Sequence, residues 1–158
     1  VLTGVVMALS HFLYMRLHPR IIEVGLHPDG SLRDRHLWNL PVLGPRTYAL
    51  RMDAALDFAT ANDLERSITL YIARHPDTQR VVLIAHPINW IDATGVEVFG
   101  TLLSQLQAQG IALHLVGLKL PVEEVLKAAG LLDEHPLLRL YRTEAEVLQG
   151  DWAGPGSS

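Results

Sequence analysis

Apolar runs recur along the chain, and their lengths predict a series of short β-strands. Residues 81–85 are continuously apolar and rich in β-branched side chains, which is typical of a strand buried on both faces of a sheet. Comparable runs predict further strands at residues 47–52, 111–116 and 137–141, and shorter ones at 21–25 and 56–58. The segments between these strands space their apolar residues differently.

That second spacing, three and four residues apart, is typical of amphipathic helices. We expect a first helix to begin at Asn62, with Glu65 as its capping-box partner, and to end before His75. A second helix would span about residues 95–109, with Gly110 as its C-terminal stop.

Two more helices follow in the same way. Pro121 and Gly130 bracket one of them, and Thr143 with Glu146 predicts a capped start for the other. Strands and helices therefore alternate along most of the chain. This order predicts a layered α/β domain whose sheet is mostly parallel beyond its first strands.

The beginning of the chain has a pattern of its own. Residues 1–15 carry no formal charge, and Arg16 and Arg20 follow at once. A membrane-spanning helix needs about 20 apolar residues, so this run is too short to span a membrane alone. Apolar residues followed by arginines favour the inner end of a membrane helix that leaves into the cytoplasm. The alternative, an amphipathic helix packed on the domain, fits Ser10 and His11 and stays open.

Composition excludes several classes of function. The 158 residues, 49% of them hydrophobic, suffice for one domain with a core. A formal net charge of −4 argues against a nucleic-acid partner. The eight histidines lack metal-site spacing, cysteine is absent, and the sequence has neither a Gly-rich phosphate loop nor a G-x-S-x-G elbow. We therefore expect no metal, no cofactor and no enzymatic activity.

The most informative motif lies where the strand at 81–85 gives way to the next helix. There Trp90, Asp92, Thr94 and Gly95 bring together an aromatic ring, an acid, a hydroxyl and a glycine. Backbone N–H groups converge at a helix start, so such a loop suits a phosphoryl group or a partner protein. The simpler interpretation is a helix cap, because T-x-x-E at the helix start matches a capping box. These residues alone leave both interpretations open.

The motif is part of a longer succession. Ile-Asp-Ala-Thr-Gly at 91–95, an amphipathic helix, a strand after Gly110, and Val-Leu-Lys-Ala-Ala-Gly-Leu at 125–131 follow in order. This succession resembles the STAS family, which includes anti-sigma-factor antagonists and the C-terminal cytoplasmic domains of SulP-type anion transporters. Leu-Arg-Met-Asp-Ala-Ala-Leu-Asp-Phe-Ala-Thr-Ala at 50–61 and the apolar start of the chain resemble the transporter branch.

The resemblance implies a small mixed central sheet flanked by about four helices, and a regulatory or interaction role instead of catalysis. It divides the chain into the end of a last transmembrane helix with its linker, the STAS domain, and a flexible tail, at residues 1–20, 21–150 and 151–158. Thr94 takes the position of the serine that a partner kinase phosphorylates in the antagonists. A phosphate there would lie close to Asp92 and Glu97, so we do not expect Thr94 to be phosphorylated.

We therefore expect the cytoplasmic domain of a bacterial SulP-type sulfate or other anion transporter, at the inner face of the cell membrane. Its expected partners are the membrane domain of the same transporter, a second protomer, or a soluble regulatory protein. The expected contact loop contains Trp90, Asp92, Thr94 and Gly95. Two alternatives stay open: a stand-alone anti-sigma-factor antagonist that acts as a phosphoswitch, and a nucleotide- or lipid-sensing STAS module. Residues 1–15 favour the transporter, since a soluble switch has no use for them.

Overall fold

The structure of the protein, a computed structural model, describes residues 2–17 and 21–150. The predicted linker at 18–20 and the predicted tail at 151–158 lie outside the described residues. Within the described ranges, the elements in chain order are α1 Leu2–Leu17, β1 Ile21–Leu26, β2 Leu32–Asp34, β3 Thr47–Met52, α2 Ala61–Arg74, β4 Arg80–Ile84, α3 Ala93–Ala108, β5 Ala112–Val116, α4 Leu120–Ala128, β6 Leu138–Tyr141 and α5 Glu144–Leu148.

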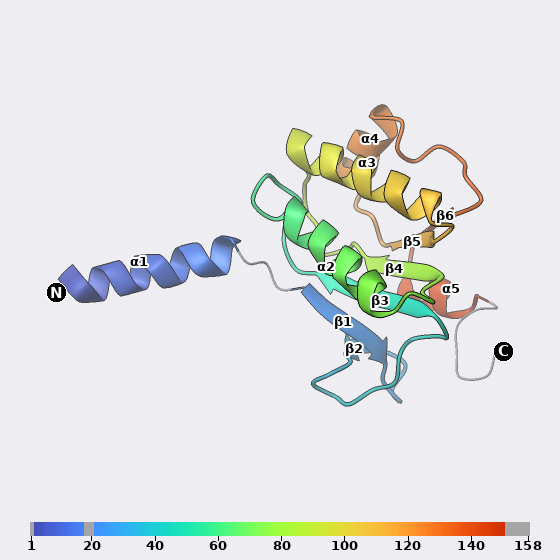
Figure 1. Cartoon of the computed structure of the whole chain (residues 1–158), viewed down its shortest axis with the longest axis horizontal. Coiled ribbons are helices and arrows are strands. Elements are labelled where there is room, and N and C mark those ends of the chain that lie inside the picture. The colour runs from blue at the N-terminus through green and yellow to red at the C-terminus, as the bar shows by residue number, and fades with distance from the viewer. Residues whose placement is uncertain (1, 18–20, 151–158) are drawn as a thin grey trace.

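The six described strands form one sheet in the order β2-β1-β3-β4-β5-β6 (Figure 1). Strand β1 runs antiparallel to β2 and β3, whereas β3, β4, β5 and β6 run parallel to one another. Each parallel connection contains one helix, as a βαβ unit requires. The predicted α/β fold with a small mixed sheet is therefore confirmed.

Helices α2, α3 and α4 cover one face of the sheet, and α5 lies against the other face (Figure 1). On the first face, Leu106 of α3 is fully buried in the same cluster as Leu83 of β4 and Leu113 of β5. Gly110, with a φ of 71°, follows the end of α3 as predicted, because a left-handed residue there suits glycine. This packing holds the first turn of α3, with the candidate motif, against the end of β4.

Residues 56–58 form a turn instead of the predicted strand. Leu56 meets Ile91 of a neighbouring loop in an isolated parallel bridge. The turn is held by Asp57, whose Oδ1 accepts a hydrogen bond from the backbone N–H of Thr60 at 3.1 Å. Residues 56–58 are too few to show whether apolar and polar side chains alternate as in a strand. The local sequence therefore cannot distinguish this turn from a strand. The three-residue strand β2 is an addition that its sequence does not predict.

The start of α2 also differs from the prediction. The helix begins at Ala61 with Thr60 as its N-cap residue, so the predicted cap, Asn62, already lies inside the helix. The Thr60 hydroxyl donates a hydrogen bond to the Ala55 carbonyl at 2.6 Å and so ties the preceding turn to the helix start. The capping box of Asn62 and Glu65 placed the start too late, because the turn at residues 55–60 holds the chain in place for a helix that begins at Ala61.

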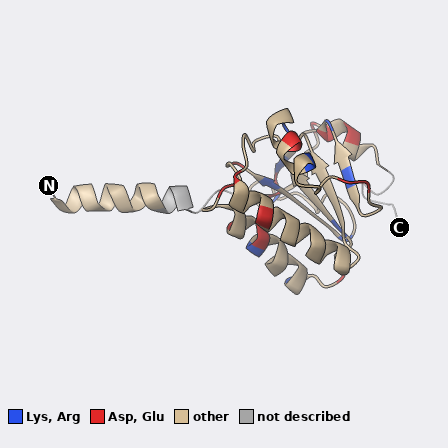
Figure 2. Ribbon diagram, turned by 90° about the horizontal axis from the view of Figure 1, so that it is seen from above, with Lys and Arg blue, Asp and Glu red and all other residues tan. Residues whose placement is uncertain are grey.

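Helix α1 lies apart from the sheet (Figure 1), and its side chains over residues 2–13 are all exposed. Figure 2 shows no Lys, Arg, Asp or Glu on this part of the helix. Among the residues that the structure describes, no helix is long and apolar enough to cross a membrane. Strand β1 begins with Ile21 opposite Met52, the last residue of β3. Helix α1 therefore leads to the edge of the sheet at which the parallel strands end, called the carboxyl edge below.

The face covered by α5 holds a buried histidine. His114 of β5 is 4% exposed, and its ring stacks on that of Tyr141 in β6, with the centroids 5.5 Å apart. Burial lowers the pKa of His114 from its ordinary value of 6.5 to about 4, and the nearby charges of Arg139 and Arg80 act in the same direction. The imidazole is therefore neutral at pH 7.

This lowered pKa predicts a loss of stability in acid. The unfolded chain takes up a proton on His114 near pH 6.5, whereas the folded protein does so only near pH 4, so stability falls as the pH drops through this window. At pH 4, this group lowers the free energy of unfolding by roughly 3 kcal/mol relative to pH 7, because each unit of pKa difference corresponds to about 1.4 kcal/mol. His114→Phe keeps an aromatic ring against Tyr141 and removes the titration. Urea denaturation from pH 7 to pH 4 should therefore show a weaker pH dependence in the variant, and an equal dependence in both proteins would contradict a neutral buried His114.

Candidate functional site

The candidate motif begins α3, and Asp92 is the residue that caps the helix. Its backbone is extended, and its Oδ1 accepts a hydrogen bond from the Gly95 N–H at 2.7 Å. The predicted capping box is therefore wrong, because Thr94 is already the second residue of the helix. Asp92 stands three residues before the N–H that it binds, which is the spacing of an N-cap acid.

The other carboxylate oxygen of Asp92 binds a different loop. Oδ2 accepts a hydrogen bond from the backbone N–H of Phe58 at 3.0 Å. Two backbone hydrogen bonds join the same segments: Leu56 N–H donates to the Trp90 carbonyl at 3.1 Å, and Asp92 N–H donates to the Leu56 carbonyl at 3.2 Å. The segments 53–60 and 85–92, called the paired loops below, therefore form one hydrogen-bonded unit.

Gly95 is buried where the paired loops meet the first turn of α3. A Cβ at this position would collide with the carbonyl oxygen of Leu56 and lie 2.8 Å from Cγ1 of Ile91. A backbone carbonyl held by a hydrogen bond cannot move aside as the end of a side chain can. Packing therefore explains the glycine of the motif.

The paired loops leave two aromatic rings in solvent. Phe58 is 70% exposed and Trp90 is 51% exposed, while Thr94 is half-buried in the first turn of α3. Of the four predicted site residues, Asp92 and Gly95 thus build the loop, whereas Trp90 and Thr94 remain accessible. Phe58 was missed because the hydrogen bond from its backbone to Asp92 spans 34 residues of sequence. The only local sign was a large apolar residue in a turn.

A third loop at the carboxyl edge joins this group. Lys119, between β5 and α4, donates a hydrogen bond from Nζ to the side-chain oxygen of Asn89 in the paired loops. The next residue, Leu120, is 62% exposed. Two neighbouring loops and the first residue of α4 therefore each bring one exposed apolar side chain to this edge. We call Phe58, Trp90 and Leu120 the carboxyl-edge surface.

This arrangement has the features of a contact surface. Asp92, the one acid among the four predicted residues, uses both carboxylate oxygens to accept hydrogen bonds from backbone N–H groups. Over the part of the chain that the structure describes, no group of three or more His, Asp or Glu side chains is placed to hold a metal ion. Exposed aromatic rings on a rigid support are typical of protein interfaces.

The six described strands form one mixed sheet with a helix in each parallel connection, and hydrogen-bonded loops lie at its carboxyl edge. This architecture is that of a small α/β domain. The family model of the STAS domain matches residues 43–147, and the chain belongs to this family. The resemblance carried by residues 91–95 and 125–131 is therefore confirmed.

A probable sulfate transporter of Mycobacterium tuberculosis is 27% identical over 151 residues, which cover 94% of this chain and 27% of the transporter. The chain thus spans about a quarter of the length of this curated relative. The murine Solute Carrier 26 family member A9 anion transporter, in its inward-facing state, matches 86% of this chain with 23% of its own, at 13% identity and a TM-score of 0.66.

A candidate anti-sigma factor antagonist of Thermotoga maritima has a similar structure as well. It matches 73% of this chain with 96% of its own, at 18% identity and a TM-score of 0.58. At these identities, the likeness to the murine and Thermotoga proteins shows a shared fold. The fold thus occurs both as part of a transporter and in a small separate protein.

The capping geometry predicts that two variants of the motif differ in stability. Asp92→Ala removes the hydrogen bonds to the N–H groups of Gly95 and Phe58 and should lower the free energy of unfolding by about 1–2 kcal/mol. Thr94→Ala removes a hydroxyl outside the cap and should change that free energy by less than about 0.5 kcal/mol. Urea denaturation of both variants measures the difference. A larger loss for Thr94→Ala would return the capping role to the threonine.

Proposed function

We propose that this chain is the cytoplasmic regulatory domain of a bacterial SulP-type transporter for sulfate or another anion, without catalytic activity of its own. The M. tuberculosis relative is a probable sulfate transporter, and the murine protein of similar fold is an anion transporter. The domain would lie at the cytoplasmic face of the cell membrane. Its first partner would be the membrane domain of the same protein, and a second protomer or a soluble regulator would be a further partner.

The observation that carries this proposal is the place of α1. Over residues 2–13 the helix is uncharged and exposed, and it leads to Ile21 at the carboxyl edge of the sheet. An exposed helix without charge is best explained by an apolar environment in the complete protein. Residues 1–20 would then be the end of the last membrane helix and its linker.

If α1 continues a membrane helix, one edge of the domain would face the membrane. Strand β1 begins beside the end of β3, so the carboxyl edge lies nearest to α1. The carboxyl-edge surface, Phe58, Trp90 and Leu120, lies on two loops and the start of α4 at that edge. We infer that this surface contacts the membrane domain, because large exposed apolar side chains on rigid loops are typical of contact sites.

The stand-alone antagonist is less well supported. Its fold is shared, but a fold does not fix a function. A stand-alone phosphoswitch leaves the exposed apolar side chains of α1 without a role. A phosphate on Thr94 would also stand beside Asp92, whose carboxylate already occupies the Gly95 N–H of the helix start.

Anion uptake by the full-length gene product tests this proposal. Uptake of labelled sulfate and of other inorganic anions is measured for the wild-type protein and for a Phe58→Ala, Trp90→Ala double variant at equal membrane abundance. We expect the double variant to change the uptake rate severalfold, because truncating aromatic anchors at an interface costs about 2 kcal/mol or more. Thermal unfolding of the 158-residue chain should change little, since both rings are exposed.

Trp38→Ala is the matched control. Trp38 is 48% exposed, close to the value of Trp90, but its ring lies against His27, which follows the end of β1 at the opposite edge of the sheet. Uptake in this variant should equal that of the wild type. No uptake of any anion by the wild type would contradict the transporter, and unchanged uptake in the double variant would contradict the contact surface alone.

A further inference from the structure

Strand β6 forms one edge of the sheet and pairs with β5 on one side. The carbonyl oxygens of Leu137 and Tyr141 accept hydrogen bonds from the β5 side at 2.7 and 2.8 Å. Successive backbone groups of a strand point in opposite directions, so those of Leu138 and Leu140 point away from β5. The outer side of β6 therefore carries backbone groups that the sheet itself does not use.

Most of these outer groups have no hydrogen-bond partner. The Leu138 N–H donates to the His135 carbonyl at 3.1 Å. Within residues 2–17 and 21–150, no group binds the Leu138 carbonyl or the N–H and carbonyl of Leu140. The opposite edge strand, β2, has only three residues, and such a short strand limits pairing. Strand β6 thus offers one donor and two acceptors to a further strand.

A pocket of about 210 Å³ opens beside this edge, on the side of the sheet that α4 covers. It is lined by Leu115, Leu118, Glu123, Leu140, Tyr141 and Arg142. Its charges are already paired, because Lys127 and Arg142 each donate to the Glu123 carboxylate at 3.2 Å. An apolar cavity of about 150 Å³ holds a benzene molecule. The pocket can therefore accept one branched or aromatic side chain next to Leu140, which is 44% exposed.

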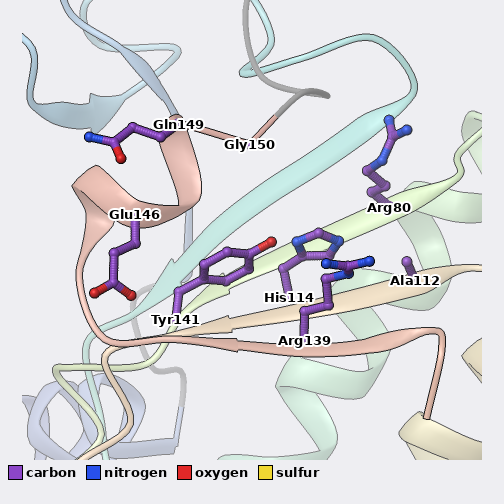
Figure 3. Close-up of a pocket in the computed structure, with 8 residues that line it drawn as sticks. All are labelled: Arg80, Ala112, His114, Arg139, Tyr141, Glu146, Gln149 and Gly150. Carbon is purple, nitrogen blue, oxygen red and sulfur yellow. The ribbon is translucent and has the colours of Figure 1, made fainter.

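The other side of β6 has a positive charge. Arg139 is exposed and lines a separate pocket on the face that α5 covers (Figure 3). Figure 3 shows the carboxylate of Glu146, another residue of that pocket, turned away from Arg139. Of the acidic side chains that the structure describes, none forms an ion pair with Arg139. A strand beside β6 would thus meet an apolar pocket on one face and a cation on the other.

We propose that β6 binds an extended segment of a partner protein as an additional strand, in which apolar residues alternate with acidic ones. Successive side chains of a strand point to opposite faces, so the apolar ones would reach the pocket beside Leu140 and the acidic ones Arg139. In this binding mode, main-chain hydrogen bonds supply affinity and alternate side chains supply specificity. Opposite charges on adjacent strands stabilise the pairing. This surface does not depend on the transporter proposal.

Titration of the 158-residue chain with the peptide acetyl-Thr-Val-Glu-Leu-Glu-Val-Thr-amide tests the surface. Amide chemical shifts are followed by NMR at constant ionic strength, so that general screening does not change. We expect saturable shifts at residues 138–142 and slower hydrogen exchange of the Leu140 N–H, which the peptide would bind. A second peptide, with lysine in place of both glutamates, should bind more weakly, because Arg139 repels it.

Reversing the charge of β6 should reverse this preference. Arg139→Glu should raise the dissociation constant of the glutamate peptide by about fivefold or more, since an attraction becomes a repulsion. The same variant should bind the lysine peptide more tightly than the wild type does. Because Arg139 is exposed, the variant should fold. Arg66→Glu makes the same change of charge on the exposed side of α2 and is the matched control, with both dissociation constants unchanged.

Four results would overturn the proposal. Absence of saturable shifts at residues 138–142, or shifts confined to other elements, would show that β6 does not receive the peptide. Equal affinity of the wild type for both peptides, or an unchanged preference in Arg139→Glu, would remove the acidic partner. Shifts at residues 138–142 that depend on the concentration of the chain alone would identify a second copy as the occupant instead.

Discussion

The carbonyl oxygen of Leu56 stands so close to the first turn of α3 that only glycine fits at position 95. The same carbonyl accepts a hydrogen bond from the N–H of Asp92, and the Asp92 carboxylate in turn binds the N–H groups of Gly95 and Phe58. One contact thereby sets the distance between two loops that are far apart in sequence. The start of α3, the end of β3 and the exposed ring of Phe58 take their places from it. Such a rigid edge can hold side chains in solvent at a fixed geometry.

This constraint divides the motif between folding and contact. Asp92 and Gly95 are used by the structure itself, so they are unavailable to a ligand, whereas Trp90 and Phe58 remain free to meet a partner. The two ends of the domain consequently differ in chemistry. Apolar rings lie at the edge toward which α1 leads, whereas Arg80 and Arg139 lie near the amino ends of β4 and β6.

Much of this fold was predictable because its signals are local. Residues 81–85 carry an apolar run that marks a buried strand, and Gly110 ends α3 as its sequence suggests. One prediction failed on a local choice, since Asp92 and not Thr94 caps α3. Another failed on a tertiary contact, since residues 56–58 turn to meet that loop. The candidate loop was thus located from sequence, but the division of roles within it was not. A pocket on the face that α5 covers gave no linear motif, because Arg80 of β4, His114 of β5 and Arg139 of β6 all contribute to its lining.

The most direct test of the central constraint compares two glycines of the same helix. In Gly95→Ala, the new methyl group must displace the Leu56 carbonyl, and the free energy of unfolding should fall by about 2–3 kcal/mol, the cost of overpacking. In Gly100→Ala, the methyl group meets only the flexible end of Leu131, with Cδ2 at 3.2 Å. The helix-propensity gain of about 1 kcal/mol should offset that contact, so stability should stay near that of the wild type. Urea denaturation of both variants decides the matter. A Gly95→Ala protein as stable as Gly100→Ala would show that the paired loops do not depend on this approach.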